Sequence, residues 1–396
     1  MPLAAYEPFV GPEAIDEIVR LAVKLEGKVV QHVNSTLDGG GVAEILHRMV
    51  PLMRQLGIDA RWNVIKGRQS FFRTTKKFHN AIQGRPQEIR TREFSTILDP
   101  SKGDIDEYLN ADFIVIHDPQ PISLVSKRTD GQGNWIWRCH IDVSEPPEAV
   151  WDFIQDFAIQ YDAVIFTAPA FAQHLPVPQH FIAPSIDPLS TKNRDLPQHE
   201  IDGVLDRLGI PRDKPIITQI SRFDHFKDPV GVIRVFRELR AEVDCRLVLA
   251  GGTASDDPES DEVVADVLAQ AAGDNDIHVL LLPPDSDTEI NALQRASTVI
   301  VQKSLKEGFG LTVTEAMWKR KPVVATTVGG IVLQVKDGYS GVLCSSIEEV
   351  VAAVKQILLD PSYAQRLGEN ARDHVRQNFL ITRHLRDYLT LFLSLQ

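Results

Sequence analysis

Residues 28–57 have the sequence KVVQHVNSTLDGGGVAEILHRMVPLMRQLG, in which a short β-branched run, a glycine-rich turn and a long amphipathic segment follow one another. The run at 28–33 is typical of a buried strand. After the glycines, apolar residues recur with the three-and-four spacing of one helical face, at Val42, Ile45, Leu46, Met49, Leu52, Met53 and Leu56. A strand that leads through glycines into a core helix predicts a parallel sheet covered by helices.

The same alternation of strands and amphipathic segments continues along the chain. In the first half we expect strands at 28–33, 59–65, 112–118, 135–141 and 163–167. In the second half we expect strands at 215–221, 245–252, 277–283, 297–304, 322–328 and 341–346. The pattern predicts an α/β chain with two doubly wound halves, which would bind a ligand in a cleft at the carboxyl ends of their strands.

The chain of 396 residues is long enough for two or three domains, and we predict boundaries from its composition. Residues 176–200 are rich in proline and polar side chains, as linkers are. We therefore expect a Rossmann-like domain over 1–185, with an extra amphipathic helix at 13–25, and a second Rossmann-like domain over 186–378. The segment 379–396 has an apolar helical stripe and is expected to pack back on the first domain.

Charge and cysteine content exclude several classes of protein. Aspartate and glutamate (54) exceed lysine and arginine (42) by 12, which argues against sequence-independent nucleic-acid binding and against adhesion to anionic membranes. Three separated cysteines, Cys139, Cys245 and Cys344, are typical of reduced core thiols. Residues 1–10 lack a basic n-region, and no run of about 18 apolar residues occurs, so we expect a cytoplasmic protein.

The first candidate for ligand binding is the turn Asp38-Gly39-Gly40-Gly41, which lies between the first strand and its helix. Glycines let a ligand approach the backbone, and the helix N-terminus offers free N–H groups to an anion or a hydroxyl-rich group. The alternative is a tight turn that needs a positive φ. One glycine would serve that turn, so three favour ligand approach. The spacing is neither G-x-G-x-x-G nor a P-loop.

The second candidate is SRFDHFKD at 221–228, after the first strand of the second half. Asp228 and the proline after it predict an N-cap and a first helical position. Arg222 and Lys227 would then flank a helix N-terminus and clamp a phosphate group. The alternative is that both cations are solvated and pair with Asp224 or Asp228.

The third candidate is EGFGLTVTE, residues 307–315, in which two carboxylates bracket a glycine loop. Glu307 lies in the loop and is expected to accept hydrogen bonds from sugar hydroxyls. Glu315 lies one turn into the next helix, where it would hold a ribose diol. Equally well, Glu315 could cap the helix instead of binding a ligand, because Thr312-x-x-Glu315 is also a capping box.

The fourth candidate is the strand WIWRCHI at 135–141. Alternation places Arg138 and His140 on one face, with His140 at the strand's carboxyl end. A lone histidine is more often a core group, but this position beside an arginine favours function. Asp118 ends the preceding strand and is expected to receive a substrate hydroxyl. Its equally plausible alternative is a turn-capping aspartate before proline.

Other reaction classes lack their signatures. G-x-S-x-G, H-E-x-x-H and a cysteine–histidine protease pattern do not occur. The acidic run at 256–262 is typical of a solvated loop and not of a magnesium site. We therefore expect metal-independent chemistry without a cofactor, in which basic residues and helix dipoles neutralise a leaving phosphate.

Taken together, the glycine turn, S-R-F-D-x-x-K-D and E-G-F-G-L-T-V-T-E resemble the GT-B retaining glycosyltransferases of the glycogen-synthase and sucrose-synthase type. More specifically, the chain resembles the trehalose synthase family in HVNST (32–36), HDPQP (117–121), WIWRCHID (135–142) and KEGFGLTVTEAMWK (306–319). The likeness runs from about Lys28 to near the C-terminus. It implies a GT-B fold and a reversible reaction in which NDP-glucose and glucose give α,α-trehalose and NDP, with the anomeric configuration retained.

The resemblance also implies roles for individual residues. Arg222 and Lys227 would bind the donor diphosphate, Glu307 the donor glucose and Glu315 the ribose. His140 would contact the transferred sugar and join the catalytic set of Glu307, Arg222 and Lys227. Further donor contacts are implied for Gly40, Gly41, Gly308, Phe309, Gly310 and Leu311. Acceptor contacts are implied for Asn34, Asp118 and Arg138.

The sequence leaves several points open. The nucleotide could be ADP, UDP or GDP, the acceptor could be glucose or a related sugar, and a homodimer is one possible assembly. Trehalose phosphorylases share much of this motif set and use inorganic phosphate instead of a nucleotide. A non-catalytic protein that binds sugar nucleotides is the third alternative, although the complete set of Arg222, Lys227, Glu307 and Glu315 argues against it.

Overall fold

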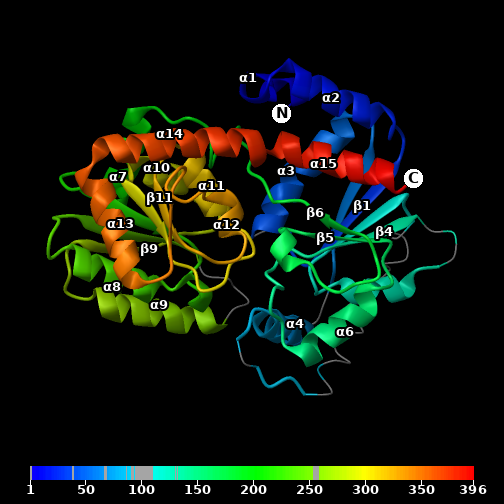
Figure 1. Cartoon of the computed structure of the whole chain (residues 1–396), viewed down its shortest axis with the longest axis horizontal. Helices are drawn as coiled ribbons and strands as arrows, with labels where there is room; N and C mark the ends of the chain where they lie inside the picture. Colours follow the sequence, from blue (N-terminus) through cyan, green and yellow to red (C-terminus); the bar gives the residue numbers. More distant parts are fainter. Residues whose placement is uncertain are drawn as a thin grey trace. The chain divides into compact units, whose positions relative to one another are not determined.

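The chain forms two compact units, which we describe separately. The computed structural model describes residues 2–37, 40–66, 69–85, 87–90, 93, 110–129, 131, 133–252 and 258–396. Unit 1 comprises 1–185 and 381–396, and unit 2 comprises 186–380 (Figure 1). The chain therefore leaves unit 1 once and returns to it with its last helix.

Unit 1 is built on a six-stranded parallel sheet with the order β2-β1-β3-β4-β5-β6. Its strands are β1 (Val29–Asn34), β2 (Asp59–Val64), β3 (Phe113–His117), β4 (Asn134–Arg138), β5 (Ala163–Phe166) and β6 (Gln179–Phe181). The five strands expected from the sequence are present, each within a few residues of its expected bounds. Strands β1, β3 and β4 are neighbours, so their carboxyl ends meet at one edge of the sheet.

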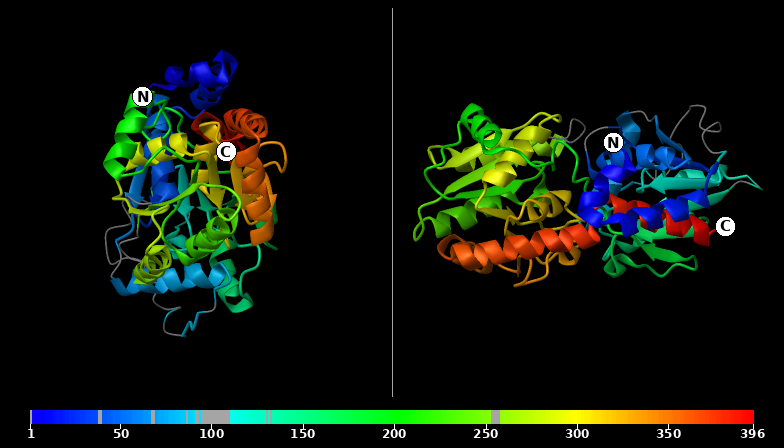
Figure 2. Two further views of the ribbon diagram at one scale, coloured as in Figure 1. Left: turned by 90° about the vertical axis from the view of Figure 1, so that its left-hand side faces the viewer. Right: turned by 90° about the horizontal axis from the view of Figure 1, so that it is seen from above.

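Helices cover the sheet of unit 1. The chain opens with a 3-10 turn η1 (Leu3–Tyr6) and the short helix α1 (Glu7–Val10), and further 3-10 turns are η3 (Ile122–Lys127) and η4 (Pro169–Phe171). The longer helices are α2 (Pro12–Val23), α3 (Gly41–Gln55), α4 (Gln69–Ile82), α6 (Glu148–Ala158) and α15 (Ile381–Ser394). Helix α15 packs against α2 and α3, as the red and blue helices in Figure 2 show, so both ends of the chain complete this unit.

Unit 2 repeats the design with a parallel sheet of order β12-β11-β10-β7-β8-β9. Its strands are β7 (Ile216–Ile220), β8 (Arg246–Gly251), β9 (Ile277–Leu281), β10 (Val299–Gln302), β11 (Val323–Thr326) and β12 (Val342–Cys344). Its helices are α7 (Gln198–Leu208), η5 (His225–Lys227), α8 (Pro229–Leu239), α9 (Pro258–Ala271), α10 (Asp287–Ala296), α11 (Leu311–Trp318), α12 (Ile331–Gln334), α13 (Ile347–Leu359) and α14 (Pro361–Asn378). All six strands expected in the second half are present.

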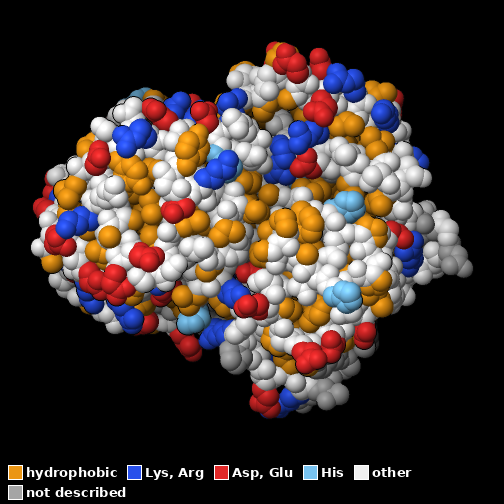
Figure 3. All heavy atoms as spheres, in the orientation of Figure 1, with side chains coloured by type: hydrophobic (Ala, Val, Ile, Leu, Met, Phe, Trp, Pro, Cys, Tyr) orange, Lys and Arg blue, Asp and Glu red, His pale blue; other side chains and the backbone are white. Residues whose placement is uncertain are grey.

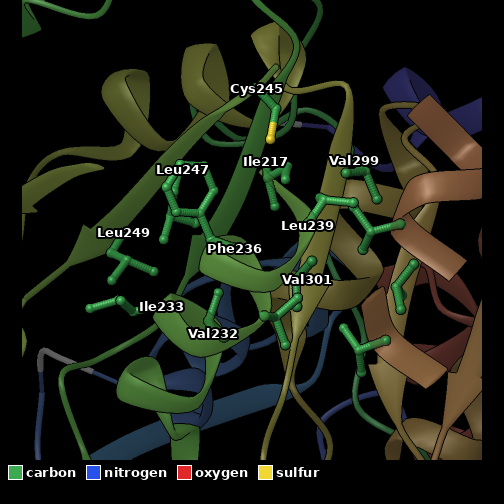
Figure 4. Close-up of a cluster of buried hydrophobic side chains, with 14 of the residues drawn as sticks. Ile217, Val232, Ile233, Phe236, Leu239, Cys245, Leu247, Leu249, Val299 and Val301 are labelled. Carbon is green, nitrogen blue, oxygen red and sulfur yellow. The ribbon is translucent and has the colours of Figure 1, made fainter. Parts of the chain in front are cut away.

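Both faces of the unit 2 sheet are buried. Because side chains alternate along a strand, Ile217 and Leu247 join one core while Ile216 and Val248 join the other. Figure 4 shows the first core, where Phe236 of α8 packs against the sheet. This two-sided burial explains why the strands appear in the sequence as continuous apolar runs.

The proline-rich stretch 176–200 is more ordered than a linker. It contains β6, and α7 begins at Gln198. Pro178 can precede β6 because this strand lies at the sheet edge, and the Pro178 carbonyl accepts a hydrogen bond from Val164 N at 2.9 Å. Ile186, the first residue of unit 2, pairs with Leu380 in an isolated bridge.

The surface carries charges of both signs. On the face shown in Figure 3, acidic and basic side chains are interspersed, with no broad field of one sign. None of the helices in the described ranges combines the length and apolar character needed to cross a bilayer.

Candidate active site

The predicted site residues lie at the carboxyl edges of the two sheets. In unit 1, Asn34 ends β1, Asp118 directly follows β3, and His140 lies two residues after β4. In unit 2, Arg222 follows β7 and Glu307 follows β10. Open parallel sheets bind ligands at this edge, so each unit presents its candidates where such chemistry is expected.

A chain of three histidines runs along the carboxyl edge of the unit 1 sheet. His32 Nδ1 lies 3.0 Å from His117 Nε2, and His117 Nδ1 lies 2.9 Å from His140 Nε2. The rings of His117 and His140 stack with centroids 5.2 Å apart. His32 and His117 are buried, and His140 is half-buried. Of the three, only His140 was singled out from the sequence, although each lies near the carboxyl end of an expected strand.

Asp118 ties two strand ends together. Its φ of 66° is a left-handed conformation that favours aspartate over most residues, and its Oδ1 accepts a hydrogen bond from the backbone N of His140 at 2.8 Å. Trp137 Nε1 donates to the Asp118 carbonyl at 3.1 Å. Burial raises the pKa of Asp118 to about 6. The carboxylate therefore serves a turn, as the alternative interpretation holds, and it also fixes the backbone of His140.

Arg138 and Asn34 direct their polar groups into the protein. Arg138 is fully buried and donates from Nη2 to the Ile182 carbonyl at 2.7 Å, whereas its Nε and Nη1 have no partner among the described residues. Asn34 accepts from Trp62 Nε1 at 2.9 Å and donates to the Thr36 carbonyl at 2.7 Å. In this conformation both side chains act on neighbouring protein groups, and their contact with an acceptor sugar stays a prediction.

The glycine turn leads directly into α3. Gly40 is the N-cap, with a φ of 130° that only glycine adopts readily, and Gly41 is the first helical residue. No described side chain caps this helix, and the space beside the Gly40 Cα is open. Asp38 and Gly39 lie outside the described residues. The turn thus needs a glycine for its backbone and also leaves room for a ligand.

In unit 2, the loop 221–228 ends in a capped helix. Asp228 is the N-cap of α8, and its Oδ1 accepts from Gly231 N at 3.0 Å, which confirms the cap predicted from the sequence. Lys303 pairs with the other oxygen of the same carboxylate. One of the free N–H groups at the N-terminus of α8 is therefore already bound by a side chain of the protein.

The two predicted phosphate-binding cations differ in their surroundings. Arg222 has a side chain 48% exposed and donates to Asp224 Oδ2 at 3.2 Å, which matches the alternative of a solvated loop charge. Lys227 is 16% exposed and forms an ion pair with Glu307, which is 9% exposed. Thus the structure brings together Lys227 and the carboxylate expected to bind the donor sugar.

Glu307 is held from several sides. Besides the Lys227 ammonium, Ser304 Oγ donates to its Oε2 at 3.3 Å, and its carbonyl accepts from Gly330 N at 3.0 Å. Gly310 has a φ of 87°, and a Cβ at this position would lie 3.2 Å from Glu307 Cγ. The glycine therefore allows both the turn and the close approach of the carboxylate.

The rest of the loop 307–315 leads into α11. Gly308 has its carbonyl against Gly330, where a Cβ on Gly330 would lie only 2.3 Å from it. Phe309 is buried, and its carbonyl accepts from Gln334. Leu311 is the first residue of α11.

The capping box predicted as the alternative role of Glu315 is wrong. Gly310, not Thr312, is the N-cap of α11, and no described side chain caps this helix. Glu315 is 1% exposed, accepts from Gln294 Nε2 at 3.2 Å and has Lys192 Nζ 4.0 Å away. Helix α11 begins at Leu311, directly after Gly310. The Thr-x-x-Glu pattern alone does not reveal this start.

The described residues do not form a metal-binding cluster. Within the described ranges, no group of three or more His, Cys, Asp or Glu side chains is arranged to hold a metal ion. The histidine nitrogens of unit 1 instead point at one another, as the two short N···N distances show.

Comparison with known proteins identifies the family. The family model "Trehalose synthase, N-terminal domain" matches residues 32–173, and "Glycosyl transferases group 1" matches residues 204–374. The chain is 44% identical to a trehalose synthase of Thermococcus litoralis, covering 99% of this chain and 97% of the relative. It is 40% identical to a trehalose synthase of Rubrobacter xylanophilus, with 99% and 97% covered.

A more distant relative also matches the sequence, and solved structures agree on the fold. A trehalose phosphorylase of Pleurotus pulmonarius is 28% identical, but the chain spans only 58% of that protein. An α,α-trehalose-phosphate synthase of Burkholderia xenovorans has a TM-score of 0.76 at 12% identity, with 93% of this chain and 100% of that chain covered. A sucrose-phosphate synthase of Thermosynechococcus elongatus has a TM-score of 0.73 at 18% identity, with 93% and 99% covered. With high identity to trehalose synthases over nearly its whole length and a GT-B fold, the chain belongs to the trehalose synthase family of glycosyltransferases.

Proposed function

We propose that this chain transfers glucose from a nucleoside diphosphate glucose to glucose, forming α,α-trehalose and NDP reversibly. The observation that carries the proposal is the 44% identity, over 99% of the chain, to proteins named trehalose synthase. The matched region spans both units, so it includes the positions of the candidate residues of each.

The residues of unit 2 suit the donor half of this reaction. Departure of a nucleoside diphosphate develops negative charge on the leaving oxygen, which fixed cations stabilise. Lys227 is held in place by Glu307, so its ammonium is positioned before a diphosphate arrives. Arg222 adds a second, more exposed cation. Glu307 would accept hydrogen bonds from the glucose hydroxyls while it keeps Lys227 oriented.

The same ion pair favours a retaining mechanism without a covalent intermediate. Glycosidases that retain configuration place two carboxylates about the bond, one of them as a nucleophile. Glu307 is ion-paired and also accepts from Ser304, which weakens it as a nucleophile. We therefore favour attack on the face from which the diphosphate leaves. The C1–O bond to phosphate breaks, the C1–O bond to the acceptor forms, and the acceptor proton passes to the departing phosphate oxygen.

The proposal is tested by running the reaction backwards. The full chain is mixed with trehalose and either ADP, UDP, GDP or inorganic phosphate, and NMR follows the release of glucose and the anomeric proton of the second product. We expect release only with a nucleotide, together with an α-linked NDP-glucose. Release with phosphate would identify a phosphorylase instead, and saturable binding without turnover would identify a binding protein. A sugar ester trapped on Glu307 would contradict the mechanism.

A further inference from the structure

We propose that His32 and His117 are positioning residues that fix the His140 imidazole as a neutral Nδ1–H donor aimed at the transferred sugar. The inference deepens the proposed function and rests on it for the identity of that sugar. It depends on the three-histidine chain of unit 1, of which only His140 has a role through the family resemblance.

The surroundings of the three histidines disfavour a charged imidazole. Burial lowers the pKa of His32 to about 3, and burial together with nearby Arg138 holds the pKa values of His117 and His140 well below the ordinary value. The other titratable groups that face the chain are His384, Tyr388 and Asp118. Asp118 is the carboxylate among them, and it binds the backbone N–H of His140 rather than a ring.

Three neutral rings carry three protons on six nitrogens. Because each of the two hydrogen bonds needs one donor and one acceptor, His117 must donate to one neighbour and accept from the other. Only two arrangements satisfy this condition. Either every ring is protonated on Nδ1, or every ring is protonated on Nε2. The tautomer of half-buried His140 is therefore coupled to that of buried His32.

His32, at the buried end of the three linked histidines, selects between the two arrangements. His32 Nε2 is buried and has no hydrogen-bond partner among the described residues. If it carried the proton, an N–H group would be buried without an acceptor, and among backbone groups such unpaired donors are rarer than under-satisfied acceptors. The favoured arrangement protonates Nδ1 throughout, so His140 presents its free Nδ1 as a donor.

A neutral donor suits the transfer of a sugar. Positive charge develops at the ring carbon in the transition state, and a nearby imidazolium would oppose it. A neutral Nδ1–H can still bind a glucose hydroxyl. The chain thereby supplies orientation and hydrogen bonding without adding charge.

Nitrogen-15 NMR of the full chain, labelled at histidine, tests the tautomer directly. We expect His140, assigned with His140→Gln, to show a protonated Nδ1 and an unprotonated Nε2 from about pH 5 to about pH 8, the range in which an ordinary histidine titrates. In His32→Met the sulfur opposite His117 Nε2 can only accept, so His117 should carry its proton on Nε2 and the other tautomer should appear at His140. His32→Asn can donate an N–H near the position of Nδ1 and should keep the original spectrum.

Kinetic measurements then distinguish a positioning role of His32 from a role in packing alone. We expect His32→Met to lower kcat about tenfold, the effect of one lost hydrogen bond in the transition state, with KM for the nucleotide unchanged. His32→Asn should restore turnover. The matched control is His180→Met, since His180 lies on edge strand β6 and also has an unpartnered buried Nε2, yet is not one of the three linked histidines.

Several results would overturn the inference. They are an Nε2–H tautomer at His140 in the wild-type protein, an unchanged tautomer in His32→Met, or a changed tautomer with full kcat. The wild-type spectrum decides the first point even if His32→Met does not fold. Absence of trehalose turnover with every nucleotide would refute the proposed function instead, while the spectrum would still decide the tautomer.

Discussion

The two units bury polar groups at the carboxyl edges of their sheets in different ways. At the carboxyl edge of the unit 1 sheet, neutral imidazoles bind one another, and the nearby Arg138 cation opposes their protonation. At the corresponding edge of unit 2, Lys227 pairs with Glu307 and Lys303 with Asp228. Linked neutral histidines can orient a hydrogen-bond donor without adding charge, whereas an ion pair can offer its cation to an incoming anion. The difference suits the proposed contacts of His140 with the sugar and of Lys227 with the diphosphate.

Removing the cation of the Lys227–Glu307 pair should have the largest effect. We expect Lys227→Ala to lower kcat/KM by about 10²–10³-fold and to weaken nucleotide binding, because it removes a fixed cation from the leaving group. It also leaves Glu307 buried without a counter-ion, which should lower the stability of unit 2. Steady-state kinetics and calorimetry measure the two effects. Lys355→Ala, which breaks an exposed pair with Glu242, is the control and should change neither.

Replacing the carboxylate of the same pair should lower turnover with little effect on nucleotide binding. We expect Glu307→Gln or Glu307→Ala to lower kcat about 10²-fold while nucleotide binding stays within about threefold, because Lys227 remains available to phosphate. Turnover assays and titration with the free nucleotide check the split. Near wild-type turnover in Glu307→Ala would show that the transferred sugar lies elsewhere.

Acid should weaken unit 1 more than unit 2. Since the pKa of His32 is about 3 when folded and ordinary when unfolded, the unfolded chain binds more protons below about pH 6.5, and stability falls as the pH falls. Between about pH 7 and about pH 5 one such histidine contributes about 2 kcal/mol. Asp118 acts in the opposite direction below about pH 6, because its pKa is raised.

Tryptophan fluorescence during urea unfolding measures this effect. Four of the five tryptophans, Trp62, Trp135, Trp137 and Trp151, lie in unit 1, so their signal follows that unit. The His32→Phe variant should unfold with a shallower dependence on pH. An unchanged slope would mean that His32 is not neutral in the folded protein.

Arg222 should be the least sensitive member of the proposed donor site. Its side chain is half exposed and already pairs with Asp224, so we expect Arg222→Ala to raise the apparent KM for the donor by about threefold to tenfold at low salt. The effect should shrink as salt is added, and kinetics at two salt concentrations checks this. A loss as large as that of Lys227→Ala would show that both cations bind the diphosphate equally.

Local patterns in the sequence were sufficient for most of the fold. Eleven strands, the N-cap at Asp228 and the glycine turn before α3 follow from apolar periodicity and short-range backbone chemistry. These patterns do not indicate strand β6, because it is a three-residue edge strand inside a proline-rich stretch. They also suggest a helix cap at Thr312, because Thr312 and Glu315 match a capping motif by spacing alone, whereas the observed N-cap is Gly310.

By itself, the sequence determined the order of strands and helices, the family, and which residues stand at strand ends. Only the tertiary structure decided which of those residues are partners: Lys227 with Glu307 across 80 positions, and His32 with His117 across 85. The physical reason is that periodicity and turn preferences act between near neighbours in the chain. Ion pairs and hydrogen bonds at a sheet edge instead depend on the order in which the strands assemble, which brings distant positions into direct contact.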